Sequence, residues 1–172
     1  MNRVFILLGS NINKEKNLPA AVLLLCEGGS LQSVSSVYET PPIGEEDQPL
    51  FWNASVLIET KLDAISFKRN VLAHIEEKLC RERTADRNAP RTIDADMTLF
   101  NQEVFDLDDA HHIPDPDLLK FRHVAVPTAE LAPNLKHPES GETLKEIARR
   151  LIAEADKAGR APLRRVPDVT LC

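Results

Sequence analysis

Residues 87–100 read RNAPRTIDADMTLF, and the second half of this stretch decides the fold. From Thr92 onward apolar and polar residues alternate, which is the pattern of a β-strand whose successive side chains point to opposite faces of a sheet. Four apolar residues fall on one face and three polar residues on the other: Ile93, Ala95, Met97 and Leu99 against Asp94, Asp96 and Thr98. The stretch therefore predicts a strand that is covered on one side only, with two carboxylates on its open side.

Strand and helix patterns alternate along the rest of the chain. Apolar, β-branched runs predict further strands over residues 4–8, 31–38 and 51–60. Apolar residues at helical spacing predict a helix capped by Asn17 and a second helix over residues 64–80. The resulting order is strand, helix, strand, strand, helix, strand, which is the ferredoxin-like βαββαβ arrangement. We therefore expect an α+β fold: an antiparallel sheet with helices on one face and the active site on the other.

The C-terminal part adds helices to this arrangement. The pattern predicts a short helix over residues 122–131 and a final amphipathic helix around residues 144–152. A chain of 172 residues is long enough for one hydrophobic core and too short for two, so we expect a single domain over residues 1–158. Residues 159–172 form a tail, which we expect either to add a late edge strand or to be loosely held.

Composition excludes several classes of protein. The three cysteines are widely spaced, which argues against a disulfide framework and against a zinc site. A net charge of -6 argues against general nucleic-acid binding, because such proteins present a basic face to the phosphates. The apolar run at residues 4–8 is too short for a signal peptide or a membrane span. We expect a cytoplasmic, monomeric protein that binds small molecules and neither nucleic acid nor membranes.

Opposite charges meet where the predicted strand begins. Four arginines fall within eleven residues and lead into the two aspartates: Arg81, Arg83, Arg87 and Arg91. At about 3.3 Å rise per residue the two aspartates lie roughly 7 Å apart at their backbones, close enough to share hard cations such as Mg²⁺. Arginines and metal ions together neutralise the phosphate oxygens in phosphoryl transfer. The alternatives are a solvated strand face and arginines that favour the dipole at the end of the preceding helix.

A second pair of residues suggests a site for a flat ring. Phe51 and Asn53 are two positions apart in a predicted strand, so their side chains face the same side. A heteroaromatic substrate can stack on the phenyl ring while the amide binds its edge. The alternative is that Phe51 belongs to the core and Asn53 to a turn.

Four motifs, in order, resemble one enzyme family. They are LLGSN at residues 7–11, YETPPIG at 38–44, DQPLFWN at 47–53 and RERTADRNAPRTIDAD at 81–96. The set is similar to 6-hydroxymethyl-7,8-dihydropterin pyrophosphokinases, and the resemblance spans roughly the first 135 residues. It implies a ferredoxin-like fold and transfer of the β,γ-pyrophosphoryl group of ATP to the hydroxymethyl oxygen of the pterin, which releases AMP during folate synthesis.

The resemblance also implies roles for individual residues. Asp94 and Asp96 are expected to hold two Mg²⁺ ions, with ATP as the second substrate. Arg81 and Arg91 are expected to contact the phosphates, while Arg83 and Arg87 lie on a mobile catalytic loop. The pterin pocket is expected to be shaped by Thr40, Pro42, Ile43, Phe51 and Asn53. Glu76 is expected to lie near the nucleotide.

The chain departs from the family pattern after the metal strand. Asp115 stands where the family has a histidine that contacts the nucleotide, and Phe121 stands where it has an arginine. Arg122 is then expected to supply the missing charge to the nucleotide, and His123 to stack on the pterin as a second ring. These departures keep two alternatives open: a magnesium-dependent nucleotidyltransferase or phosphodiesterase, and a homologue that binds pterin or nucleotide with altered catalysis.

Overall fold

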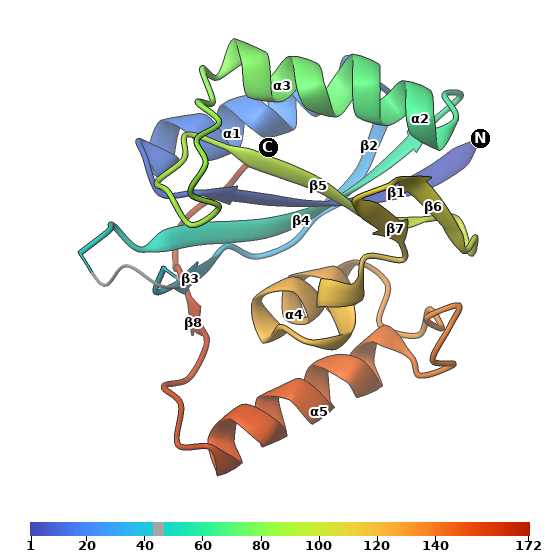
Figure 1. Cartoon of the computed structure of the whole chain (residues 1–172). Helices are drawn as coiled ribbons and strands as arrows, with labels where there is room; N and C mark the ends of the chain where they lie inside the picture. Colours follow the sequence, from blue (N-terminus) through green and yellow to red (C-terminus); the bar gives the residue numbers. More distant parts are fainter. Residues whose placement is uncertain (43–46) are drawn as a thin grey trace.

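The computed structural model describes residues 1–42 and 47–172, which fold around one antiparallel sheet (Figure 1). The strand order is β5-β1-β4-β3-β8, and β2 also pairs with β4. The strands are β1 (Asn2–Ser10), β2 (Ser30–Val34), β3 (Tyr38–Thr40), β4 (Phe51–Thr60), β5 (Asp94–Phe100) and β8 (Arg164–Arg165). The predicted α+β class, with an antiparallel sheet and helices, is confirmed.

The two long central strands are apolar because both of their faces are covered. In β1 the side chains of Val4 and Ile6 belong to one hydrophobic cluster, whereas Phe5 between them belongs to a second cluster on the opposite face. The first cluster lies under α1 (Lys14–Leu25) and a long helical segment. That segment consists of α2 (Ala64–Phe67), a π-helical stretch (Lys68–Leu72) and α3 (Ala73–Lys78). Figure 1 shows both helices on the same side of the sheet.

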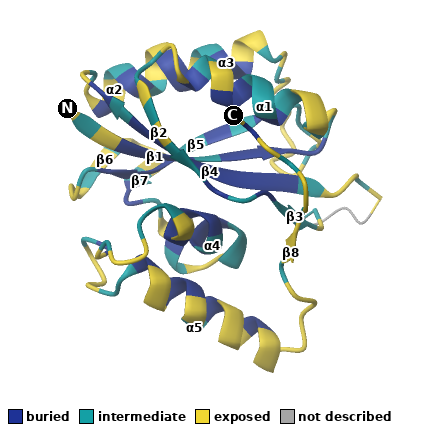
Figure 2. Cartoon of the chain, turned by 180° about the vertical axis from the view of Figure 1, so that it is seen from behind, coloured by how far each residue is buried: buried dark blue, intermediate teal, exposed yellow. Residues whose placement is uncertain are grey.

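The second face of the sheet is covered by the C-terminal helices that the sequence added to the βαββαβ arrangement. The 3-10 helix η2 (Pro116–Leu119) and α4 (Arg122–Leu131) pack there, with α5 (Leu144–Lys157) outside α4. Figure 2 shows the outer face of α5 as largely exposed. The C-terminal helices were expected, but the sequence did not place them; they pack here because Phe5, Leu57 and Leu99 give this face apolar residues of its own to bury.

A β-bulge changes the faces of β5. Phe5 pairs with Leu99, but Ile6 pairs with Met97, so Thr98 is the bulged residue and has no partner residue in β1. The Thr98 hydroxyl donates to the Phe5 carbonyl instead, at 3.2 Å. Leu99 is therefore on the α4 face, and the prediction that it shares a face with Ile93, Ala95 and Met97 is wrong. The side of β5 predicted to be open is buried at Thr98.

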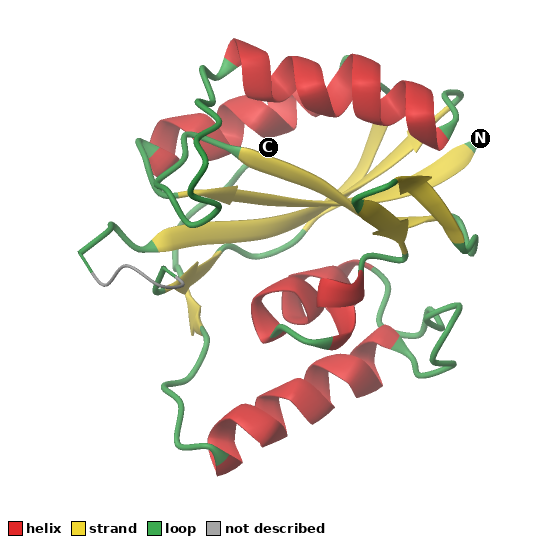
Figure 3. Cartoon of the chain, viewed as in Figure 1, coloured by secondary structure: helices red, strands yellow, loops and turns green. Residues whose placement is uncertain are grey.

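Two other local predictions differ from the structure, and one hairpin was not predicted. The first helix begins at Lys14 rather than after Asn17, with Asn13 as its N-cap residue, and Asn17 donates to the Ile12 carbonyl. The single strand expected over residues 31–38 is divided into β2 and β3. A short hairpin of β6 (Phe105–Asp108) and β7 (His111–Ile113) follows β5 as a separate sheet (Figure 3).

The tail forms an edge strand, which was one of the two alternatives expected from the sequence. β8 pairs antiparallel with β3 at the end of the sheet path. Beyond it, Leu171 is 5% exposed and packs into the cluster under α1. Among the described residues no helix is long and apolar enough to cross a membrane.

Candidate functional site

Two cavities meet at the beginning of β5. The sheet-side cavity has a volume of about 610 Å³ and is lined by residues of the sheet, α4 and α5. The loop-side cavity has a volume of about 550 Å³ and lies between the helix ending at Lys78 and the loop that follows it. Both are lined by Arg87, Arg91, Asp94 and Asp96. The charged residues singled out by the sequence therefore form the boundary between two neighbouring cavities.

Arg81 is the most strongly anchored of the four arginines. Its guanidinium is 2.8 Å from the Glu76 carboxylate, and it also pairs with Asp94 and donates to the Ile93 carbonyl. These carboxylates raise its pKa, although burial acts in the opposite direction. The buried Nε of Arg81 has no hydrogen-bond partner among the described residues. This guanidinium thus has one buried donor without a partner among the described residues.

Arg91 joins the loop to the sheet. Its Nη1 is 2.7 Å from Asp94 Oδ2, and its guanidinium carbon lies 5.8 Å from the centre of the Phe51 ring. Its backbone NH donates to the Asn11 side chain at 2.8 Å. Asp94 is consequently held between two arginines.

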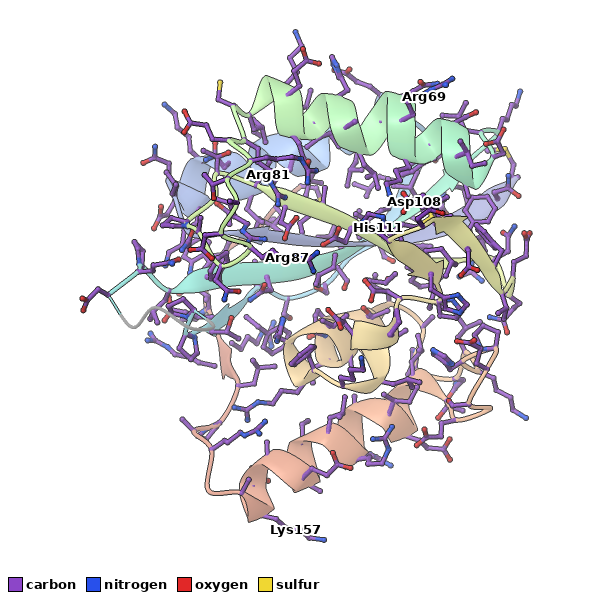
Figure 4. The ribbon with its side chains drawn as sticks, viewed as in Figure 1. Arg69, Arg81, Arg87, Asp108, His111 and Lys157 are labelled. Carbon is purple, nitrogen blue, oxygen red and sulfur yellow. The ribbon has the colours of Figure 1, made fainter. Side chains whose placement is uncertain are left out.

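Arg83 and Arg87 are held less firmly. Arg83 contacts Glu76 from a side chain that is 73% exposed, and Arg87 lines both cavities from the loop. Figure 4 labels Arg81 and Arg87, which come from the same loop between α3 and β5. The structure brings all four predicted arginines to one end of the sheet, with Glu76 among them.

Asp96 lies among other carboxylates. Burial raises its pKa, and the nearby charges of Asp94, Asp115 and Glu76 raise it further. Such a group is stabilised by a cation, because a positive charge relieves both the desolvation and the repulsion. Within the part of the chain that the structure describes, no three His, Cys, Asp or Glu side chains gather as a complete metal site. The donor set thus suits a cation that takes its remaining ligands from a substrate or from water.

The sheet-side cavity contains the predicted ring-binding residues. Phe51 and Asn53 lie on β4, and the Asn53 amide donates to the Thr40 hydroxyl at 2.9 Å. The rings of Phe121 and His123 lie across the cavity with their centres 5.4 Å apart, and burial lowers the His123 pKa. The structure brings four of the six predicted pterin residues together as cavity walls: Thr40, Phe51, Asn53 and His123.

The other two predicted pterin residues are not placed in the cavity. Pro42 follows β3 but is not among the residues that line the sheet-side cavity. Ile43 lies outside the described residues. The wall opposite His123 is therefore defined here by Thr40, Phe51 and Asn53.

The departures from the family pattern have specific positions. Asp115 caps η2 by accepting from the Asp117 backbone NH at 2.9 Å, while it also faces the sheet-side cavity. The Arg122 guanidinium donates to the Ala161 carbonyl of the tail and lines the sheet-side cavity. Arg122 does not line the described part of the loop-side cavity. Its placement does not support the predicted contact with a nucleotide there.

Sequence reasoning missed residues that complete the site from a distance. Asn11 holds the arginine loop through two bonds: its side chain accepts from the Arg91 NH, and its own NH donates to the Arg91 carbonyl at 3.1 Å. The motif containing Asn11 signalled the resemblance but gave no role for this residue. Glu154 of α5 and Arg160 of the tail line the sheet-side cavity. No local sequence signal identifies them, because they reach the cavity only through the packing of α5.

Paired carboxylates, a cluster of arginines and two adjoining cavities form one arrangement. Carboxylates with a cation, and arginines, are the groups that stabilise a phosphoryl or pyrophosphoryl group in transit. Two cavities that meet at those groups can present one small molecule to another. The fold and the site together define a transferase that moves a phosphate-containing group between two small molecules.

A model of the 7,8-dihydro-6-hydroxymethylpterin-pyrophosphokinase (HPPK) family matches residues 5–133 of the chain. Because this match covers well over half of its length, the chain belongs to the HPPK family. The resemblance found in the sequence motifs is confirmed.

Curated relatives agree with the family model. The 2-amino-4-hydroxy-6-hydroxymethyldihydropteridine pyrophosphokinase of Bacillus subtilis is 38% identical over 152 residues, which cover 86% of this chain and 89% of that protein. The protein of the same name from Helicobacter pylori is 35% identical over 132 residues, covering 74% of this chain and 80% of that protein.

Solved structures share the fold at low sequence identity. A crystal structure of Plasmodium falciparum HPPK-DHPS, a triple mutant with STZ-DHP, matches with a TM-score of 0.71 at 14% identity. The match covers 93% of this chain and 45% of that one, so the chain spans less than half of the longer protein.

Proposed function

We propose that the loop-side cavity binds ATP and the sheet-side cavity binds 6-hydroxymethyl-7,8-dihydropterin, with the reacting groups meeting at Asp94 and Asp96. As a member of its family the chain is a pyrophosphokinase of folate synthesis. It transfers the pyrophosphoryl group of ATP to the hydroxymethyl group of the pterin. The single observation that carries the proposal that the two substrates meet is that both cavities share the walls formed by Arg87, Arg91 and the two aspartates.

The arginines act on the triphosphate. Arg81 lines the loop-side cavity, where its positive charge lies beside the proposed triphosphate, and Arg91 lies at the boundary between the cavities. Arg83 and Arg87 extend from the loop, where they add positive charge beside the transferred group. Glu76 positions Arg81 and Arg83 by accepting from both guanidiniums. Such charges lower the barrier because they are oriented before the reaction begins.

The two aspartates are the proposed magnesium ligands. Asp96 is the stronger candidate, since its carboxylate lies close to other carboxylates and Arg81 offsets their effect only in part. Asp94 contributes an oxygen while Arg81 and Arg91 hold its orientation. Two Mg²⁺ ions bound here would supply charge neutralisation and orientation for the phosphates, with ligands completed by phosphate oxygens and water.

The pterin lies against the rings of the sheet-side cavity. Phe51 and His123 offer stacking surfaces, and Asn53 offers a buried amide for the ring edge. Burial lowers the His123 pKa and so favours the neutral ring, which suits stacking on a neutral heterocycle. The roles of Pro42 and Ile43 in the pterin pocket stay predictions. Arg122 is proposed to stay in this cavity and not to contact the nucleotide.

Product analysis tests this proposal. The full chain would be incubated with magnesium, ATP and 6-hydroxymethyl-7,8-dihydropterin, and nucleotides would be separated by chromatography. We expect AMP to be released only when the pterin is present. Release of ADP or free pyrophosphate in place of AMP would contradict the proposal. The cytoplasmic location, the monomeric state and the lack of nucleic-acid binding stay predictions.

A further inference from the structure

The C-terminal tail, residues 159–172, follows the segment matched by the family model and reaches the sheet-side cavity. Gly159 adopts a φ of 69°, in the left-handed region, and turns the chain at the end of α5. Arg160 then lines the cavity together with Glu154 and Ala155 of α5. The tail is therefore part of the wall beside which the pterin is proposed to bind.

The tail is attached to β3 by backbone pairing. Glu39 pairs with Arg164 and Tyr38 with Arg165, and the Val166 NH donates to the Val37 carbonyl at 2.8 Å. Without β8, β3 would be a three-residue edge strand supported by β4 alone on its sheet side. An edge strand this short gains much of its order from its outer neighbour.

Side chains add further attachments. The Arg164 guanidinium is 3.3 Å from the Glu39 carboxylate, and the Arg122 guanidinium donates to the Ala161 carbonyl. At its far end the tail is fixed by Leu171, which is buried under α1. Figure 1 shows the tail running from α5 past β3 to the helices on the opposite face of the sheet. The tail thus joins the two layers that enclose the sheet-side cavity.

Both elements attached to the tail carry proposed pterin-binding residues. β3 ends at Thr40, whose hydroxyl holds the Asn53 amide. The first turn of α4 carries Arg122 and His123. In contrast, no residue of the tail lines the described part of the loop-side cavity. Release of the tail should therefore disturb one cavity and leave the other unchanged.

We propose that the C-terminal tail is a positioning element for the pterin: it fixes β3 and the first turn of α4 so that Thr40, Asn53 and His123 face one ligand. This inference rests on the assignment of the sheet-side cavity to the pterin. It gives the tail a role in substrate binding, in addition to its contribution to the core through Leu171.

Variants that release the tail test this role in the full-length chain. Val166→Pro removes the NH that bonds to Val37, whereas Val166→Ala keeps it and serves as the matched control. Leu171→Ala weakens the far attachment, and Ile152→Ala on exposed α5 is its control. We expect Val166→Pro and Leu171→Ala to raise the KM for the pterin about three- to tenfold, the range for losing one hydrogen bond or apolar contact. The KM for ATP and kcat should stay within about twofold, and both controls should match the wild type.

Hydrogen exchange of residues 159–172 shows whether each variant has released the tail. A released tail with an unchanged KM for the pterin would overturn the proposal, and so would equal increases in both KM values. Loss of cooperative melting in both Val166→Pro and Leu171→Ala would overturn it as well, because the tail would then be required for folding. A wild-type chain that makes no AMP would contradict the proposed function instead.

Discussion

The two cavities are built in different ways, although they share a boundary. The loop-side cavity is lined almost entirely by one continuous part of the chain, residues 68–96, with only a short contribution from the β6–β7 hairpin. The sheet-side cavity draws its walls from β1, β3, β4, β5, α4, α5 and the tail. A site made by one stretch can be identified in the sequence, whereas a site assembled by packing depends on how the layers meet. The two kinds of site should also respond differently to mutation.

The shared boundary should give the largest effect on catalysis. We predict that Asp96→Ala lowers kcat by a hundredfold or more, on the order of the loss when one preorganised electrostatic group is removed. The fold should stay intact, because removing one of several neighbouring carboxylates relieves repulsion. Turnover and thermal melting would be measured beside Asp109→Asn, a change at an exposed aspartate in the hairpin turn. A lost melting transition in Asp96→Ala would show that the residue is structural.

The loop-side cavity should show a large difference in stability between two arginines that share Glu76. Arg81 is 12% exposed and pairs with Glu76 and Asp94, so Arg81→Ala leaves two partly buried carboxylates without that partner. We predict a loss of about 3 kcal/mol in the free energy of unfolding. Arg83 is 73% exposed, so Arg83→Ala should cost less than about 0.5 kcal/mol. Equal losses in urea unfolding would contradict this account of the loop.

The sheet-side cavity should respond through the pterin alone. Asn53→Ala removes the amide that bonds Thr40, and we predict that the KM for the pterin rises about tenfold while the KM for ATP is unchanged. Steady-state kinetics with each substrate varied in turn would measure this difference. Asn70→Ala, at an exposed position of the π-helical stretch, is the control. An equal rise in both KM values would mean that the cavities are not separate binding sites.

The smallest effect is expected far from both cavities. His112 lies 2.8 Å from Asp106 and 2.9 Å from Glu139, and its hydrogen bonds to these two carboxylates raise its pKa. The two carboxylates stabilise the protonated imidazole in the folded state. The resulting contribution to the free energy of unfolding is full below about pH 6.5, the ordinary pKa of histidine, and is lost as pH rises through the raised pKa. The difference in Tm between the wild type and His112→Gln, which does not titrate at this position, should decrease slightly as pH rises over that interval.

Much of the fold could be predicted from the sequence because its helices and strands have strong local patterns. The α4 helix spans Arg122–Leu131 as predicted, and β5 begins within two residues of its predicted start. The bulge at Thr98 could not be predicted, because it depends on the register between β5 and β1. The position of α4 on the second face likewise depends on long-range packing that no local pattern specifies.

The candidate site was predicted unevenly for the same reason. The charged residues of the loop and of β5 are close in sequence, so their spacing already places them together. The contact of Asn11 with Arg91 joins positions 80 residues apart, and Arg160 reaches its cavity only because α5 packs outside α4. Arg122 was predicted to contact the nucleotide from its position beside Phe121, but its bond to Ala161 could be recognised only after folding.

A crystal structure with magnesium, a non-hydrolysable ATP analogue and 6-hydroxymethyl-7,8-dihydropterin tests the central claim most directly. We predict the triphosphate beside Arg81 and Arg91, metal ions between the phosphates and the two aspartates, and the pterin ring between Phe51 and His123. The hydroxymethyl oxygen should point toward the boundary formed by Asp94 and Asp96. A pterin bound outside the sheet-side cavity, or a triphosphate without contact to either aspartate, would contradict the account.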